Sequence, residues 1–276
     1  CDRHQHCGTM TSTSNEDLGS MNLSQYPIDT PENPETQRLI QDCRVELSEN
    51  GMCVLPDFVS VTTLERMQQE AISLSPGAYY NEHWRTTLRG GGDSPVGEST
   101  KATRASVWLI AFDQMGPDSP SRQLYESDDL LNFVSEITGQ PELYRCVDPI
   151  VSCSFTIFRN GDELGWHYDP KTNLVVTLQL QKADEGGDFE FANGVRSHEF
   201  DDTEIELSII EGRYAGVQRP DLQPGTLTII NGHTSFHRVT PTSGHKERVM
   251  AIFNYSTTPE YHFSEKIRKK FFGRVT

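Results

Sequence analysis

The sequence predicts an α+β fold, with helices in the first half of the chain and a β-sandwich or barrel in the second half. Three observations lead to this prediction. Apolar residues of the first half recur at helical spacing, whereas after about residue 145 the chain changes to six short apolar runs separated by turn residues. Hydrophobic residues make up 35% of the 276 residues, which is enough for a sizeable core.

Three stretches of the first half are predicted to be helices, residues 36–51, 60–75 and 123–139. In each stretch, apolar residues recur every three or four positions, so one face of the helix can pack on a core. Gly51 is typical of a residue that ends a helix, and Ser60 of one that caps the start. Two shorter apolar runs between these helices predict strands, and they read MCVLPDF and ASVWLIAF.

Segments without such periodicity are predicted to be a tail and a loop. Residues 1–34 are polar, so we expect a tail or a surface arm that precedes a single domain over residues 35–276. Residues 76–103 are rich in Gly, Ser and Thr, but their glycine run lacks the Gly-Lys-Ser/Thr sequence of a phosphate loop. We therefore expect a mobile loop, long enough to be a lid over a site.

The second half is predicted to contain a β core over about residues 145–257, followed by a short basic helix. The apolar runs of the core are rich in β-branched and aromatic residues, which are typical of strands. The six runs read IVSCSFTIF, NLVVTLQLQ, GDFEFA, EIELSII, TLTIING and RVMAIFNYS.

Charge and composition argue against several classes of partner. The formal net charge is −16, and the sequence lacks the Lys and Arg clusters that attract nucleic acids or anionic membranes. No apolar run approaches the roughly 18 residues of a transmembrane helix, and the first thirty residues lack the apolar core of a signal peptide. The six cysteines show no disulfide-rich pattern, so we expect reduced thiols and a cytoplasmic protein.

The clearest functional signal is the sequence HYD, which places His167 and Asp169 two residues apart in an extended segment. With nine His and forty Asp plus Glu, about one His-x-Asp/Glu match is expected by chance, and the chain contains two. Residues i and i+2 of an extended segment face the same side, so His167 and Asp169 can bind one ion. The second match, HKE at 245–247, lies in a polar turn and is interpreted as a solvated loop.

A metal ion held by these two residues needs a third ligand, for which His237 is the best candidate. Its distance along the chain is expected if the ligands come from opposite sheets of the β core. Two His and one carboxylate on one face of iron leave about three positions, enough for a bidentate 2-oxoacid and dioxygen. Arg248 begins the next apolar run, and its planar guanidinium matches the far carboxylate of 2-oxoglutarate.

In this order and spacing, these residues resemble the iron(II)/2-oxoglutarate-dependent oxygenases. The resemblance covers nearly everything after residue 35, and the group it favours is the free-standing amino acid hydroxylases and halogenases that include BesD. The segments that favour this group are DELGWHYDP, EGGDFEF, LQPGTLTIING and HRVTP. The resemblance implies a double-stranded β-helix core of the jelly-roll or cupin-like type, with the N-terminal helices packed on one sheet.

The resemblance also implies roles for the residues of the motif. Iron(II) is expected to bind to His167, Asp169 and His237, and 2-oxoglutarate to Arg248, with dioxygen as the other co-substrate. Many superfamily members also hold 2-oxoglutarate with a Ser two residues after the Arg. This chain has a Met there, and Thr177 is the alternative donor. No catalytic residue is predicted beyond the metal ligands.

Asp169 favours one reaction within the group. In the halogenases a small residue replaces the carboxylate and opens a site for chloride, so the presence of Asp169 favours hydroxylation of an unactivated C–H bond. The products expected from 2-oxoglutarate are succinate and carbon dioxide.

The expected substrate is a small molecule, a free amino acid. Arg104 resembles the position that binds the carboxylate of the amino acid, and Asn254 is a second candidate on the alternating face of Arg248. Members that take lysine need polar or acidic groups where this chain has Ile150 and Leu164, which favours a neutral or apolar side chain.

Several alternatives stay open. A halogenase, a desaturase or a cyclising oxygenase shares the same chemistry, because the pose of the substrate decides the outcome. A peptide or protein hydroxylase would need an open groove, which residues 76–103 could block or form. From a different class, a metal-free β-sandwich binding module would use its His and Asp residues only structurally.

Overall fold

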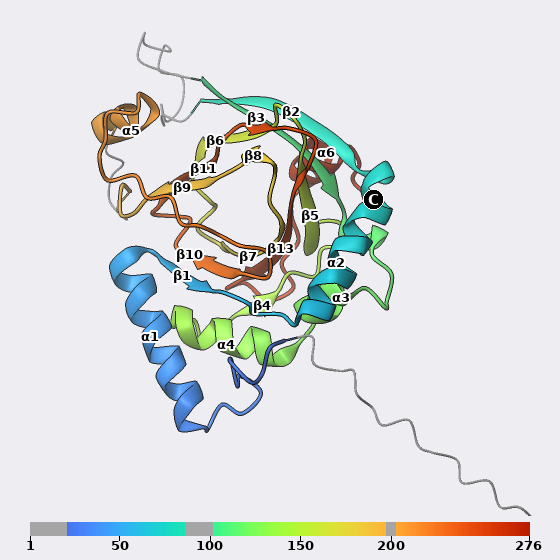
Figure 1. The fold of residues 1–276 in the computed structure, drawn as a ribbon, viewed down its shortest axis with the longest axis vertical. Helices are drawn as coiled ribbons and strands as arrows, with labels where there is room; N and C mark the ends of the chain where they lie inside the picture. The colour runs from blue at the N-terminus through green and yellow to red at the C-terminus, as the bar shows by residue number, and fades with distance from the viewer. Residues whose placement is uncertain (1–20, 87–101, 197–202) are drawn as a thin grey trace, which may run out of the picture.

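Strands of this chain join in one curled antiparallel sheet at the centre of the molecule (Figure 1). The computed structural model describes residues 21–86, 102–196 and 203–276. The strands of the sheet are β1 (Met52–Leu55), β2 (Tyr79–Thr86), β3 (Ala102–Ile110), β4 (Tyr144–Arg145), β5 (Cys153–Phe158), β6 (Glu163–His167), β7 (Asn173–Gln181), β9 (Phe189–Ala192), β10 (Leu227–Ile230), β11 (Phe236–Val239) and β13 (Arg248–Ser256). Two short strands, β8 (Glu185–Gly186) and β12 (Thr242–Ser243), form a separate pair.

The strand order agrees with the predicted jelly-roll type of core. The main path is β1-β10-β7-β13-β5-β3-β6-β11-β9, with β2 added to β3 and β4 added to β13. Neighbours in space are therefore mostly distant in sequence, as in β13 between β7 and β5. The sheet also takes in β1, β2 and β3, so it extends beyond the core expected over residues 145–257.

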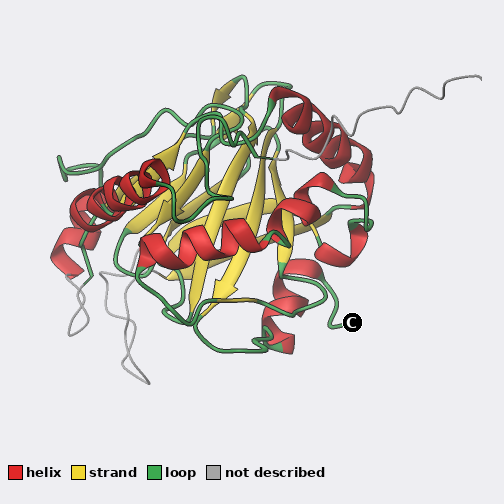
Figure 2. Cartoon of the chain, turned by 90° about the horizontal axis from the view of Figure 1, so that it is seen from below, coloured by secondary structure: helices red, strands yellow, loops and turns green. Residues whose placement is uncertain are grey.

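Helices cover the outside of the sheet, as Figure 2 shows from below. The described residues form the helices α1 (Pro34–Asn50), α2 (Val61–Leu74), α3 (Pro120–Tyr125), α4 (Asp128–Thr138), α5 (Thr203–Ile210) and α6 (Glu265–Phe272), with 3-10 turns at Ser75–Gly77 and Phe112–Gln114. The α1 helix contacts α4 and β1, α2 contacts β7, α3 contacts β5, and α6 contacts β2 and β3. The predicted packing of the N-terminal helices on one side of the sheet is thus confirmed.

Local sequence explains where these helices begin and end. The side chains of Asn33, Ser60 and Ser127 each accept a hydrogen bond from a backbone N–H in the first turn of α1, α2 and α4. Gly51 and Gly139 follow α1 and α4 in left-handed conformation, which costs glycine nothing.

The β13 strand shows how one strand serves both the core and the interior of the sheet. Ala251, Phe253 and Tyr255 are fully buried in the large core beneath the helices. The alternate residues face the other way, and Arg248 and Met250 line a cavity inside the curled sheet. A single alternating segment therefore contributes to stability on one face and to the site on the other.

Two predicted elements were wrong. EIELSII, predicted as a strand, lies in α5, where Glu206 and Ile209 are both buried. A strand would point these residues to opposite faces, whereas a helix places them on one face, where Tyr168 Oη donates to Glu206 Oε1 at 2.8 Å. Residues 79–86 were expected in a loop but form β2, which pairs with β3 along its length. Its polar sequence gives no signal for a strand, and only the backbone pairing with β3 defines one.

The helix predicted over 123–139 is divided. The α3 helix ends at Tyr125 with Glu126 as its C-cap, and Ser127 caps the start of α4, so the chain turns between two shorter helices. The expected tail also differs in part, since Tyr26 and Ile28 are buried in the core and Tyr26 Oη donates to Pro56 O at 2.6 Å. Residues 21–33 are thus a packed arm.

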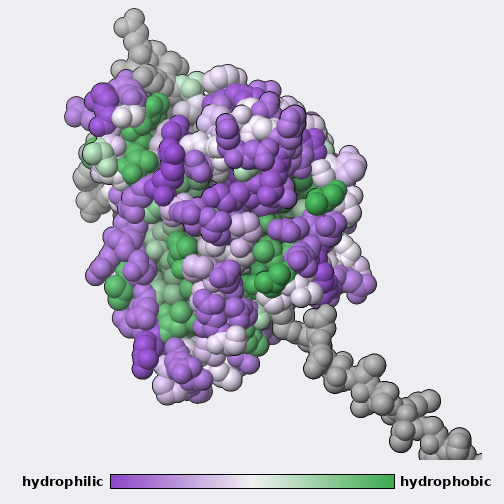
Figure 3. All heavy atoms as spheres, viewed as in Figure 1, coloured by the Kyte–Doolittle hydropathy of each residue, from purple (hydrophilic) through white to green (hydrophobic). Residues whose placement is uncertain are grey.

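The glycine run of the predicted lid and the first twenty residues lie outside the described part of the chain. The face shown in Figure 3 is largely hydrophilic with separate apolar patches, in line with the formal charge of −16. Among the helices described, none has the length and apolarity needed to cross a bilayer.

Candidate active site

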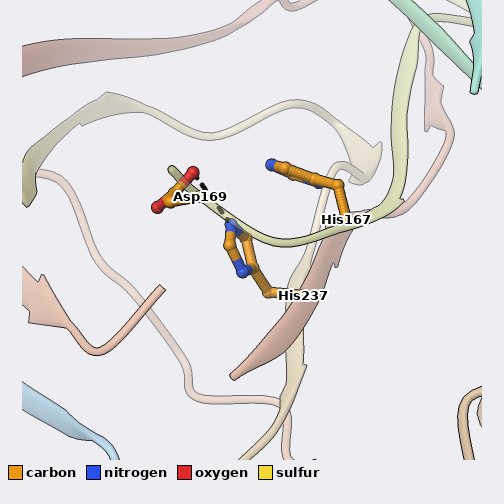
Figure 4. A group of neighbouring side chains, drawn as sticks. All are labelled: His167, Asp169 and His237. Carbon is orange, nitrogen blue, oxygen red and sulfur yellow. Dashed lines mark ion pairs between the residues drawn. The ribbon is translucent and has the colours of Figure 1, made fainter. Parts of the chain in front are cut away.

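The side chains of His167, Asp169 and His237 point toward one another at one end of the curled sheet (Figure 4). One ligand atom of each lies within 4.8 Å of the others, and His237 Nε2 is 3.7 Å from Asp169 Oδ1. The β6 and β11 strands pair with His237 opposite His167, and Asp169 follows just beyond β6. Strand pairing therefore brings together the residues that the sequence analysis chose as metal ligands.

Backbone carbonyls orient both imidazole rings. Nδ1 of His167 is 2.9 Å from Gly165 O, and Nδ1 of His237 is 2.9 Å from Ser235 O. Because a carbonyl oxygen only accepts, each Nδ1 carries the proton and each Nε2 keeps a lone pair for a metal ion. Two neutral imidazoles and one carboxylate on one face are a donor set that suits iron(II) and leaves other positions open.

The turn between β10 and β11 makes room for the carboxylate of Asp169. The Asp169 N–H donates to Gly232 O at 2.9 Å. A Cβ atom on Gly232 would overlap the carboxylate and lie 2.8 Å from Asp169 Cγ. Because Gly232 has no side chain, the carboxylate of Asp169 can lie against the backbone of this turn, with its Oδ1 toward His237.

Arg248, at the start of β13, is a buried cation with unused hydrogen-bonding capacity. Its side chain is 2% exposed, and Nη1 has no hydrogen-bond partner among the described residues. Burial lowers the pKa of Arg248 to about 10, which leaves the guanidinium charged at neutral pH. A buried donor of a charged group without a partner is costly, so the position fits an anionic ligand such as the far carboxylate of 2-oxoglutarate.

A cavity of about 210 Å³ is lined both by this arginine and by the three predicted metal ligands. We call it the central cavity; its polar lining consists of Arg248, the three metal ligands and Thr156, Thr177 and Thr228, and the rest is apolar. Thr177 and Thr228 lie opposite each other on β7 and β10. The hydroxyl of Thr228 is buried and has no partner among the described residues, so it has a donor to offer to a ligand in this cavity, and the sequence analysis did not single it out.

The sequence TLTIING could have indicated that Thr228 shares a face with Thr226, because every second residue of an expected strand faces the same side. Which of the two faces turns inward depends on pairing with β7, and that pairing is visible only in the structure.

A second and larger cavity, of about 680 Å³, shares His167 and Asp169 with the central cavity. We call it the aromatic cavity. Its aromatic lining residues are Trp84, Trp166, Tyr168, Phe236, Tyr261, Phe263 and Phe271. Phe271 borders both cavities, so the two spaces meet at His167, Asp169 and this ring.

A buried ion pair holds the C-terminal wall of the aromatic cavity. Asp148 is fully buried, and its Oδ2 accepts from the N–H of Phe263 and from Arg268 Nε, both at 2.9 Å. Its Oδ1 accepts from the N–H groups of Ile150 and Val151. The loop before β5 thereby anchors the segment that carries Phe263 and α6.

The two residues predicted to bind substrate, Arg104 and Asn254, line neither the central cavity nor the aromatic cavity. Arg104 forms an ion pair with Glu82 at 2.8 Å and donates to Gly161 O, and it lines neither cavity. Asn254 is buried; its Nδ2 donates to Val151 O, and its Oδ1 accepts from Nδ2 of Asn173, which lines the aromatic cavity. Substrate binding by Arg104 or Asn254 stays a prediction.

Comparisons with known proteins agree with this geometry. The family model described as halogenase D matches residues 35–271. The α-ketoglutarate-dependent epimerase SnoN from nogalamycin biosynthesis has a similar structure, with 16% identity and a TM-score of 0.56 over 80% of this chain and 84% of its own. HygX from Streptomyces hygroscopicus, solved with nickel, 2-oxoglutarate and hygromycin B, has 12% identity and a TM-score of 0.53 over 82% and 88%. No curated protein matches the chain.

Proposed function

The chain belongs to the halogenase D family and is an iron(II)/2-oxoglutarate-dependent oxygenase, and on this premise we propose that it hydroxylates an unactivated C–H bond of a free amino acid. The observation that carries the proposal is Asp169. Its carboxylate lies within reach of both histidines, so a metal ion there has its third protein ligand. The halogenases that the sequence resembles have a small residue at this position, which leaves space for a halide.

The roles of the other residues follow from their contacts. Arg248 and the hydroxyls of Thr177 and Thr228 would hold the far carboxylate of 2-oxoglutarate in the central cavity. The Nδ1 hydrogen bonds keep His167 and His237 aimed at the metal position. When bound, iron(II) and 2-oxoglutarate supply the activation of dioxygen and the oxidation of the C–H bond, with succinate and carbon dioxide as products.

The wall between the two cavities contributes by excluding water. Phe271 and apolar side chains of β3, β7 and β13 line the central cavity together with the proposed metal ligands. Water excluded from such a site cannot compete with substrate for the oxidant. In this proposal the substrate approaches from the aromatic cavity, because that cavity borders His167 and Asp169, is not lined by Arg248 and is large enough for an amino acid.

A panel of free amino acids tests this proposal. Purified protein with iron(II), 2-oxoglutarate and oxygen is expected to release succinate in the presence of its substrate, and mass spectrometry is expected to show a product with one added oxygen atom. A chlorinated product in chloride buffer, or loss of two hydrogens, would instead assign the halogenase or the desaturase and cyclase alternatives.

Two variants make the test specific. Asp169→Ala is expected to lower turnover more than about 100-fold, because losing a direct ligand exceeds the typical effect of losing a partner of a ligand. His245→Ala changes the histidine of HKE, the second His-x-Asp/Glu match. It is expected to leave turnover unchanged, since His245 is exposed. Undiminished turnover in Asp169→Ala would contradict the proposed ligand set.

A spectrum recorded without oxygen tests the alternative that the protein is a metal-free binding module. Iron(II) plus 2-oxoglutarate is expected to produce a weak visible charge-transfer band in the wild type. A flat spectrum would reject the oxygenase proposal in favour of the binding module.

A further inference from the structure

A sulfur atom in the wall of the central cavity indicates a modification site, on the condition that the proposed function holds. Met250 belongs to β13 and lines the same cavity as His167, Asp169 and His237. Among the described residues of this wall, it is the one that contains sulfur. Many superfamily members have a Ser at this position, so the sulfur adds a reactive group that a hydroxyl does not provide.

Met250 faces the cavity and not the core of the protein. It is 5% exposed, yet the large core beneath the helices contains its strand neighbours Val249 and Ala251 and not Met250 itself. It pairs with Thr156 of β5, which also lines the central cavity. The thioether therefore lies on the inner face of the sheet, where the flexible methionine side chain can reach what the cavity holds.

The small size of the cavity keeps this sulfur close to the metal ligands. Its volume of about 210 Å³ is below the roughly 300–1,000 Å³ that is typical of ligand pockets. An oxygen atom activated in this space without a substrate meets C–H bonds, aromatic rings and one thioether. The thioether reacts most readily, because a lone pair of sulfur accepts the oxygen atom and no C–H bond has to break.

We propose that Met250 accepts the oxygen atom when no substrate is bound and becomes methionine sulfoxide. In this reaction the O–O bond of dioxygen and the C1–C2 bond of 2-oxoglutarate break. One oxygen atom forms the S–O bond, and the other enters the new carboxylate of succinate. The sulfur supplies two electrons and the decarboxylation of 2-oxoglutarate supplies two, so dioxygen is fully reduced and no further reductant is needed.

The sulfoxide changes the site of 2-oxoglutarate, because Arg248 is the neighbour of Met250 on the inner face of β13. The two residues are two positions apart in this strand, and both line the central cavity. Nη1 of Arg248 is buried and has no hydrogen-bond partner among the described residues. A sulfoxide oxygen beside it accepts from this donor and competes with the far carboxylate of 2-oxoglutarate. Oxidation of Met250 thus ends the consumption of 2-oxoglutarate without substrate.

Isotope-labelled dioxygen tests the modification site directly. The protein is supplied with iron(II), 2-oxoglutarate and labelled dioxygen, without any substrate and with catalase to remove peroxide, and its peptides are read by mass spectrometry. We expect one labelled oxygen atom on Met250. Met52 is the internal control, because it is 4% exposed and lines neither cavity. An oxidant that diffuses through the protein reaches both residues, whereas one formed in the central cavity labels Met250 and leaves Met52 unlabelled.

Calorimetry on the nickel-loaded protein tests the consequence without turnover. After substrate-free turnover and exchange of iron for nickel, the oxidised protein is expected to bind 2-oxoglutarate at least about tenfold more weakly than untreated protein, as for loss of a hydrogen bond to a charged group. Met250→Leu keeps an apolar side chain of similar volume, so the same treatment is expected to leave its affinity unchanged. Met52→Leu, the matched control, is expected to lose affinity as the wild type does.

Four results would overturn the proposal while leaving the oxygenase assignment intact. With a normal visible band, they are no succinate release without substrate, succinate release with Met250 unlabelled, equal label on Met52 or on an aromatic ring of the cavity, or oxidised protein that binds 2-oxoglutarate as tightly as untreated protein. If the wild type gives no visible band with iron(II) and 2-oxoglutarate, the proposed function itself fails, and this inference fails with it.

Discussion

The central cavity and the aromatic cavity meet at two metal ligands but are built from different parts of the chain. Strands of the sheet form almost all of the central cavity, which has a volume of about 210 Å³. Connecting segments and the C-terminal region form most of the aromatic cavity, whose volume is about 680 Å³. In the proposed function, paired strands bind a co-substrate of fixed structure, whereas the substrate is bound by segments that can change without disturbing the sheet.

Two arginines, the buried Arg248 and the half-buried Arg268, show the same contrast in energetic terms. Arg248 in the central cavity has no ion pair among the described residues, while Arg268 beside the aromatic cavity is paired with the fully buried Asp148 at 2.9 Å. The first charge awaits a ligand, and the second one stabilises the fold. Changing each in turn tests whether binding and stability are separated in this way.

Arg248→Met is expected to have the largest effect on binding. The affinity for 2-oxoglutarate should fall at least about 30-fold, because the carboxylate loses a desolvated charge partner. The apo protein should be as stable as the wild type or more stable, because the variant removes a buried unpaired cation. Calorimetry and urea unfolding measure the two effects. A large loss of apo stability would show that Arg248 has a structural partner.

Arg268→Met is expected to give the opposite pattern. Removing it leaves the buried carboxylate of Asp148 without its charge partner, which typically costs about 3–5 kcal/mol of unfolding free energy. The affinity for 2-oxoglutarate should change little, because Arg268 does not line the central cavity. Urea unfolding checks the first part, and calorimetry at a temperature where the variant is folded checks the second. Equal losses of 2-oxoglutarate affinity in Arg248→Met and Arg268→Met would show that binding and stability are not divided between the two arginines.

Gly232→Ala tests the junction of the two cavities. The new Cβ would displace the Asp169 carboxylate, and we expect iron(II) affinity to fall about 10- to 100-fold, as for other changes next to metal ligands. Calorimetric binding of iron(II) or nickel measures the change. Gly116→Ala is the control, since no heavy atom lies within 4 Å of a Cβ there. Wild-type metal affinity in Gly232→Ala would mean that the turn yields and that Asp169 keeps its place.

Thr228→Val is expected to have the smallest effect. The substitution replaces the hydroxyl by a methyl group of similar size, so loss of one hydrogen bond should lower the affinity for 2-oxoglutarate by about tenfold at most. Stability should stay the same or rise, because the hydroxyl is buried without a partner. Thr177→Val, measured in parallel, decides between the two threonines. Loss of affinity only in Thr177→Val would favour the donor that the sequence analysis chose.

The residues closest to the metal were the most predictable part of the site. His167 and Asp169 could be placed on one face from their spacing alone, because extended backbone repeats every two residues. His237 and Arg248 required a resemblance to known oxygenases, since no local pattern connects positions seventy residues or more from His167. The pairing of β6 with β11 supplies that connection in the structure.

Residues whose environment depends on several elements were less predictable. EIELSII alternates like a strand, yet burial of Glu206 beside Tyr168 requires a helix. Arg104 precedes an apolar run as expected, but β2, whose polar sequence gave no strand signal, places Glu82 beside it. In both cases a contact with a distant segment outweighed the local pattern.

By itself, the sequence determined the fold class, the positions of most strands and helices, and the types of residue that can bind iron and 2-oxoglutarate. These depend on periodicity and on the chemistry of single side chains, which are local properties. Only the tertiary structure decided that Thr228 faces Arg248's cavity, that Gly232 makes room for Asp169, and that Arg196 stacks in the wall of the aromatic cavity. The pairing of β10 with β7 places Thr228, a backbone hydrogen bond joins Gly232 to Asp169, and stacking on Tyr168 places Arg196, and all of these contacts join residues far apart in the chain.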